Sequence, residues 1–140
     1  MKNTIFAIRG KSNIGKTTTI KIIYDLLKSK YPNAIIEELI IAVDIKVIIT
    51  INNIKIGIES QGDPNGRLEK SLKYFVDSKC NIIVCGARTR GMTNDWIKKY
   101  SKQFAIKWIS KSISSNSNNE EIDNKNQANE IVKSIESLLK

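Results

Sequence analysis

Two glycines, a lysine and a threonine near the start of the chain have the spacing of a phosphate-binding loop. The segment reads G-K-S-N-I-G-K-T, with Gly10 first, Gly15 sixth, and Lys16 and Thr17 directly after it. Glycines permit backbone angles that other residues avoid, so such a loop can turn successive N–H groups toward an anion. Lys16 would then bridge the β- and γ-phosphates of a nucleoside triphosphate, and the Thr17 hydroxyl would coordinate Mg²⁺.

The flanking residues supply the elements that such a loop needs. Residues 4–8 form a short apolar run typical of a buried strand, and residues 17–28 place their large apolar side chains on one helical stripe. A strand, a glycine loop and a helix therefore follow in the required order. We assign triphosphate binding to Gly10, Lys11, Ser12, Asn13, Ile14, Gly15, Lys16, Thr17 and Thr18.

Three more polar residues are candidates for the same site. Glu59 closes the apolar run of residues 54–58, where a strand-end acid could hold Mg²⁺, or could simply be a surface carboxylate. Gln61 and Asp63 follow in a loop that we expect beside the γ-phosphate, where they could orient water or accept a proton. Asp63 also precedes a proline, which is an ordinary turn signal.

Two arginines follow another predicted strand. Arg88 and Arg90 lie at the carboxyl end of the apolar residues 81–85, on the edge where open α/β sheets bind ligands. They could stabilise a transferring phosphate or grip an anionic substrate, or they could be solvated loop residues. With Lys16, Gln61 and Asp63 they complete our set of candidate catalytic residues.

Composition limits the protein class. The 140 residues fit one domain spanning the whole chain, 1–140, and the chain has a formal charge of +9, two cysteines and no histidine. A zinc site is therefore not expected, and the cysteines are interpreted as buried structural thiols. The lysines are scattered, which supports a nucleic-acid partner only weakly. Without a membrane span or signal peptide, we expect a cytoplasmic protein.

Strand and helix patterns alternate along the chain. Residues 44–51 and 54–58 alternate in polarity around Asn52 and Asn53, which predicts a β-hairpin, whereas residues 34–39 could be a strand or irregular. Helices are predicted over 68–77, from Thr93 or Asn94 to residue 102, and from residue 120 or 127 to 139. Residues 81–85 and 104–109 are predicted strands, and 112–119 a loop. We expect a three-layer α/β/α fold with a mostly parallel sheet and one antiparallel hairpin.

The glycine loop in this context resembles the P-loop NTPase superfamily, along nearly the whole chain. Residues 10–19 are similar to the deviant Walker A motif of the ParA/MinD class, with Lys11 where that class has a signature lysine. That class has glycines where Ser12 and Asn13 stand here. The resemblance implies a nucleotide-dependent homodimer, in which this lysine reaches the neighbouring subunit's nucleotide.

The predicted hairpin is similar to the Ras-like arrangement, in which an antiparallel strand pair leads to an Asp-x-x-Gly switch. Glu59 to Gly62 keeps that spacing with a different acid. No Asn-Lys-x-Asp guanine motif follows, so ATP with Mg²⁺ is expected rather than GTP. We expect an ATPase that switches contact with a protein partner. A small-molecule kinase and a non-hydrolysing nucleotide- or nucleic-acid-binding adaptor are the alternatives.

Overall fold

The computed structural model describes residues 2–11, 14–111 and 117–140. Their strands are β1 (Thr4–Arg9), β2 (Ile35–Ile41), β3 (Ile45–Ile51), β4 (Ile54–Glu59), β5 (Ile82–Ala87) and β6 (Ala105–Ser110). Their helices are α1 (Lys16–Lys30), α2 (Leu68–Asp77), α3 (Met92–Lys98) and α4 (Ser117–Leu138). Residues 34–39, whose sequence left two interpretations open, thus fall largely within a strand.

The six strands form one mixed sheet in the order β2-β3-β4-β5-β1-β6. Strands β4, β5, β1 and β6 are parallel, whereas β3 is antiparallel to both of its neighbours. The predicted hairpin is confirmed as β3 and β4, but the expectation of a single antiparallel hairpin is wrong, because β2 and β3 form a second. Only three residues separate β2 from β3, and a parallel pair needs a crossover of a dozen residues or more.

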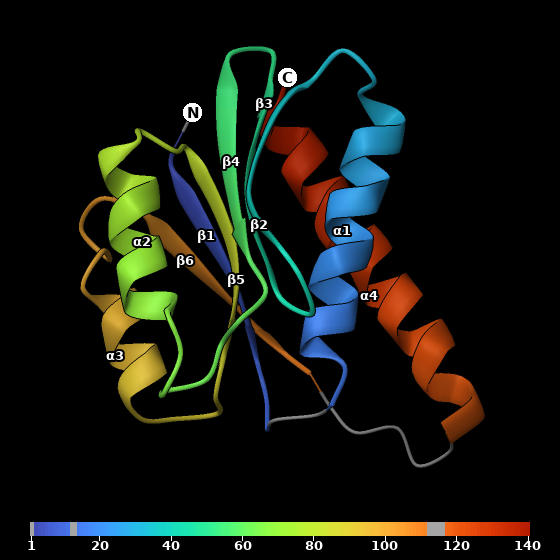
Figure 1. Cartoon of the computed structure of the whole chain (residues 1–140), viewed down its shortest axis with the longest axis vertical. Coiled ribbons are helices and arrows are strands. Elements are labelled where there is room, and N and C mark those ends of the chain that lie inside the picture. Colours follow the sequence, from blue (N-terminus) through green and yellow to red (C-terminus); the bar gives the residue numbers. More distant parts are fainter. Residues whose placement is uncertain (1, 12–13, 112–116) are drawn as a thin grey trace.

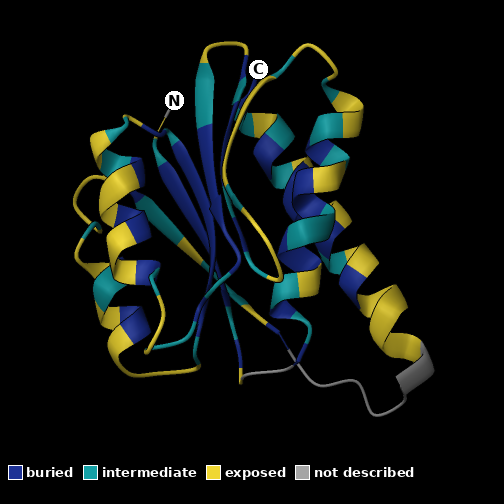
Figure 2. Ribbon diagram, in the orientation of Figure 1, coloured by how far each residue is buried: buried dark blue, intermediate teal, exposed yellow. Residues whose placement is uncertain are grey.

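Helices cover both faces of the sheet, which gives the chain three layers. Helices α1 and α4 pack on one face, and α2 and α3 lie on the other (Figure 1). The buried side chains line the two sheet–helix interfaces, as the dark ribbon in Figure 2 shows. These observations confirm an α/β architecture.

The core is built largely from β-branched residues. On the α1 face, alternate positions of β3 and β4 point into the core, including Val47, Ile49, Ile56 and Ile58. Branched side chains pack well on a pleated surface, which is why this isoleucine-rich sequence favours strands. Both cysteines are buried on the opposite face, and burial raises the pKa of Cys80 to about 11 and that of Cys85 to about 12.

Two helix boundaries differ from the sequence prediction by three residues or more. Helix α3 ends at Lys98, four residues early, because the Tyr100 and Ser101 N–H groups bond three residues back and form a turn toward buried Phe104. Helix α4 begins at Ser117, inside the segment predicted as a loop. The rest of that segment, residues 112–116, lies outside the described residues. No described helix is both long and apolar enough to cross a membrane.

Candidate functional site

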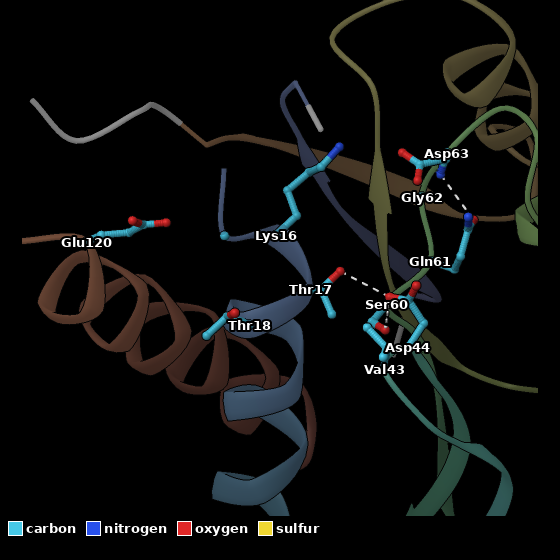
Figure 3. A pocket seen from close by; sticks show the side chains of 11 residues that line it. Lys16, Thr17, Thr18, Val43, Asp44, Ser60, Gln61, Gly62, Asp63 and Glu120 are labelled. Atoms are coloured by element: carbon cyan, nitrogen blue, oxygen red, sulfur yellow. Dashed lines mark hydrogen bonds between the residues drawn. The ribbon is translucent and has the colours of Figure 1, made fainter. Parts of the chain in front are cut away.

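The loop after β1 opens onto a cavity of about 460 Å³ at the carboxyl ends of the parallel strands. Three chain segments and one residue of α4 line it (Figure 3). The lining residues are Gly15, Lys16, Thr17, Thr18, Val43, Asp44, Ser60, Gln61, Gly62, Asp63 and Glu120. The structure thus brings four of the predicted loop residues together with Gln61 and Asp63.

Lys16 is a buried cation at this cavity. Its side chain comes from the first turn of α1, and its Nζ donates hydrogen bonds to the carbonyl oxygens of Gly10 at 2.7 Å and Ala87 at 2.9 Å. Within the described part of the chain, no carboxylate forms an ion pair with it. Burial lowers the pKa of Lys16 to about 8, partly opposed by Asp63 and assisted by Arg88. An anion entering the cavity would therefore meet a positive charge without a direct counterion.

The lowered pKa of Lys16 predicts a pH dependence of anion binding. In the free protein the ammonium loses its proton as the pH rises through about 8, and only the charged form attracts phosphate. Affinity for ATP should therefore fall roughly tenfold between about pH 8 and pH 9.5. Titrations at a series of pH values would measure this fall. A Lys16→Arg variant, which keeps its charge, should show a flat profile, and a flat wild-type profile would contradict the prediction.

Thr17 is linked to an acid that the sequence did not reveal. Its hydroxyl donates to Asp44 Oδ1 at 3.0 Å, and the Ser60 hydroxyl donates to the same oxygen at 2.8 Å. Asp44 lies in the short connection between β2 and β3, and Ser60 follows β4 directly. The Ser60 hydroxyl oxygen also accepts the Ile45 N–H at 2.8 Å, which ties this connection to the end of β4. A carboxylate thus lies beside the threonine at the cavity wall.

Glu59, the acid that we expected beside Thr17, is engaged elsewhere. Its carboxylate is fully buried and accepts two hydrogen bonds from Arg67, at 2.7 Å and 3.0 Å, and one from Ser71 at 2.6 Å. Side chains alternate along a strand, so Glu59 lies on the α2 side while Ile58 faces α1. Glu59 does not line the cavity and anchors the start of α2 instead.

Gln61, Asp63 and Arg88 form a connected group at the other cavity wall. Gln61 Oε1 accepts the Asp63 N–H at 3.1 Å, which closes a tight local turn. Asp63 Oδ1 accepts a 3.0 Å hydrogen bond from Arg88 Nε, and both side chains are partly exposed. The guanidinium is thus connected to the cavity through Asp63.

The loop that carries these residues presses directly on β5. A methyl group on Gly62 would lie 2.4 Å from the Gly86 carbonyl carbon and 2.8 Å from the Ala87 nitrogen. Both neighbours are backbone atoms, so no side-chain rotation relieves the clash. The glycine is what allows the loop to hold Gln61 and Asp63 near Lys16.

This close approach predicts an effect of Gly62→Ala. The substitution should reduce the free energy of unfolding by about 1–3 kcal/mol, because backbone segments must separate. Gly86→Ala is a matched control, since a methyl group there would meet its nearest atoms at 3.5 Å and beyond. Urea denaturation of both variants would measure the difference. Equal losses in the two variants would show that the approach at Gly62 is unimportant.

The remaining predicted residues are more dispersed. Lys11, Arg88 and Arg90, with Thr89, line a separate open concavity of about 560 Å³. Gly10 and Ile14 do not line the main cavity; Ile14 is buried, and its Cδ1 would be 2.3 Å from a methyl group on Gly10. Ser12 and Asn13 lie outside the described residues.

Gly15 is required by its conformation and by its surroundings. Its φ of 92° is left-handed, and an added methyl group would meet the buried side-chain amide of Asn124 at 2.7 Å. Asn124 belongs to α4 and accepts a hydrogen bond from the Thr19 hydroxyl at 3.2 Å. Helix α4 therefore supports the loop from behind, a contact that spans more than a hundred residues of sequence.

Sequence reasoning missed Val43, Asp44 and Glu120 at the cavity. Asp44 occupies a turn between apolar strands, and only the antiparallel pairing of β2 with β3 brings that turn to Thr17. The described residues contain no group of three or more histidine, cysteine or acidic side chains suited to hold a metal ion. Comparisons with protein-family models, curated proteins and solved structures found no match to this chain.

Proposed function

We propose that the chain binds Mg·ATP in the main cavity and hydrolyses it as a nucleotide-dependent switch. The observation that carries the proposal is the buried ammonium of Lys16, the first residue of α1. It donates hydrogen bonds to the carbonyl oxygens of Gly10 and Ala87. Helix N-termini and buried cations both favour phosphate groups. The sequence pattern of residues 10–17 and this geometry point to the same ligand.

The residues present suit a magnesium-bound triphosphate. The left-handed Gly15 leads the backbone into α1, whose first N–H groups have no partner within the helix. Thr17 and Asp44 offer hydroxyl and carboxylate oxygens, the donors that Mg²⁺ takes alongside phosphate oxygens and water. Mg²⁺, when bound, would neutralise phosphate charge. We assign its protein contacts to Thr17 and, directly or through water, to Asp44.

The loop of residues 60–63 provides the groups for hydrolysis and switching. Gln61 and Asp63 line the cavity and could orient an attacking water or accept its proton. Ser60 and Thr17 both donate to the Asp44 carboxylate. If Thr17 exchanged this partner for Mg²⁺, the β2–β3 connection that carries Asp44 and the loop that begins at Ser60 would both lose a contact. We expect this change in the loops to alter the contact with a protein partner.

A phosphotransferase is the second candidate, and one observation favours it. The concavity of Lys11, Arg88 and Arg90 lies next to the glycine loop and contains three cations, only one of which pairs with a described carboxylate. An anionic phosphate acceptor would suit such a surface. The main cavity would then hold the phosphate donor.

Phosphate release tests the proposal. Purified protein with Mg·ATP should release inorganic phosphate faster than a Lys16→Ala variant, alone or with added candidate partners. Parallel reactions with nucleosides, nucleotides and sugar phosphates would detect transfer, which would favour the phosphotransferase. Release equal to that of the variant, with no transfer, would count against both activities and leave only nucleotide binding.

A further inference from the structure

The strand β2 presents an unusually apolar free edge. It pairs only with β3, and its side chains are exposed along most of its length (Figure 2). Ile35 is 72% exposed, Ile41 55%, and Val43, just beyond the strand, 81%. Exposed apolar edge strands are templates for pairing with another strand, and folded proteins usually protect them.

The charges along this edge are entirely acidic. No lysine or arginine occurs between Lys30 and Lys46, whereas Glu37 and Glu38 lie in the middle of β2. A symmetric pairing of two β2 edges would bring these glutamates together near its centre, and like charges in opposed positions are destabilising. The β2 edge therefore disfavours pairing with a second β2 edge and suits a basic partner strand.

The opposite edge of the same sheet has the complementary character. Within the described residues, strand β6 pairs only with β1, and no acidic residue occurs in the sequence between Asp95 and Glu120. Lys107, in the middle of β6, is exposed, while its neighbours Ile106 and Trp108 are partly buried. One chain thus carries an acidic apolar edge and a basic edge at opposite ends of one sheet.

The two edges also match in direction and face. Two antiparallel steps separate β2 from β4, so β2 runs in the same direction as β4 and, through the parallel strands, as β6. Glu38 is opposite Val47 and Lys107 is opposite Phe6, and both partners belong to the core under α1 and α4. Glu38 and Lys107 therefore lie on the same face of the sheet.

We propose that β2 of one molecule pairs in parallel with β6 of a second copy, with Glu38 against Lys107. The contact is head-to-tail, so a pair of copies keeps one free β2 edge and one free β6 edge, and the association can continue. The register shift between Glu38 and Ile40 limits the paired segment to the first half of β2. We therefore expect a weak, concentration-dependent assembly.

Sedimentation velocity without nucleotide tests this contact independently of ATP binding. At about 0.15 M salt, which screens the repulsion between cationic copies, wild-type protein should form larger species as concentration rises from about 5 to 500 µM. Glu38→Lys and Lys107→Glu should each raise the concentration for assembly by at least about tenfold. Glu130→Lys, at an exposed position of α4, makes the same change in net charge as Glu38→Lys and should have no effect.

An equimolar mixture of the two charge-reversed variants gives the sharpest result. Each variant carries the partner that the other needs, so the mixture should regain wild-type assembly. A β2–β2 contact would instead leave Lys107→Glu without effect on its own and would end at a dimer. Circular dichroism would establish that each charge-reversed variant is folded. If one of them is not, the single variants Glu38→Gln and Lys107→Gln would replace the pair. The neutral variants should also assemble more weakly than wild type. A wild type that stays monomeric, or a mixture that does not recover, would overturn the proposal.

Discussion

Replacing Lys16 with methionine should weaken Mg·ATP binding by at least about 100-fold, which corresponds to about 2.7 kcal/mol. The substitution keeps the length and the apolar stem of the side chain while removing the ammonium that lies between Gly10 and Ala87. A charge-assisted bond to phosphate in a buried site contributes more than an exposed one, because water competes less. Equilibrium binding of a fluorescent ATP analogue would measure the loss.

A second lysine on the same helix provides the control for this effect. Lys28 lies in the last turn of α1, is partly exposed, and pairs loosely with Asp25 at 3.7 Å. Lys28→Met makes the same change in net charge far from the cavity and should leave affinity within about twofold of wild type. If both variants lost affinity equally, nonspecific charge rather than the loop would hold the nucleotide.

The other large effect concerns Arg67, which holds the buried Glu59 carboxylate. Arg67→Met should lower the free energy of unfolding by roughly 3 kcal/mol, because it leaves a buried carboxylate without its cation. Adding Glu59→Gln should restore part of the loss, since the two side chains are directly coupled. Urea denaturation of the single and double variants would measure this coupling. Additive losses would mean that the ion pair contributes nothing specific.

Glu59→Gln and Asp44→Asn test which of the two acids serves the proposed Mg²⁺ site. Folded Glu59→Gln protein should bind Mg·ATP nearly as well as wild type, whereas Asp44→Asn should lose most of the dependence of ATP affinity on Mg²⁺ while remaining folded. The reason is that Asp44 contacts Thr17 at the cavity and Glu59 contacts Arg67 and Ser71 behind the sheet. If Glu59→Gln lost the Mg²⁺ dependence and Asp44→Asn kept it, Glu59 rather than Asp44 would be the acid that serves the metal.

The sequence predicts local elements well because their patterns are local. The alternation of residues 44–58 predicts β3 and β4, and the helical stripe after Lys16 predicts α1. The antiparallel partner β2 is harder to predict, because residues 35–41 are apolar on both faces and show no period of two. Its pairing depends on the short turn before β3, which the sequence analysis did not use.

The residues of the candidate site likewise fall into those that sequence spacing predicts and those that depend on the fold. Lys16, Thr17, Gln61 and Asp63 follow from spacing along the chain, and the structure places them around one cavity. Asp44 could not be found in this manner, because its partner Thr17 is 27 residues away and the contact depends on strand order. Glu59 has the sequence position of a metal ligand, but the pleat of β4 turns its side chain toward α2.

Calorimetric titration of the folded wild-type chain with Mg·ATP tests the account most directly. The arrangement of the glycine loop, Lys16, Thr17 and Asp44 predicts one site per chain, with a dissociation constant of about 1–100 µM at neutral pH. It also predicts that the heat disappears in Lys16→Met. A folded sample that gives no heat of binding with ATP at about 1 mM, at two temperatures, would contradict the central claim.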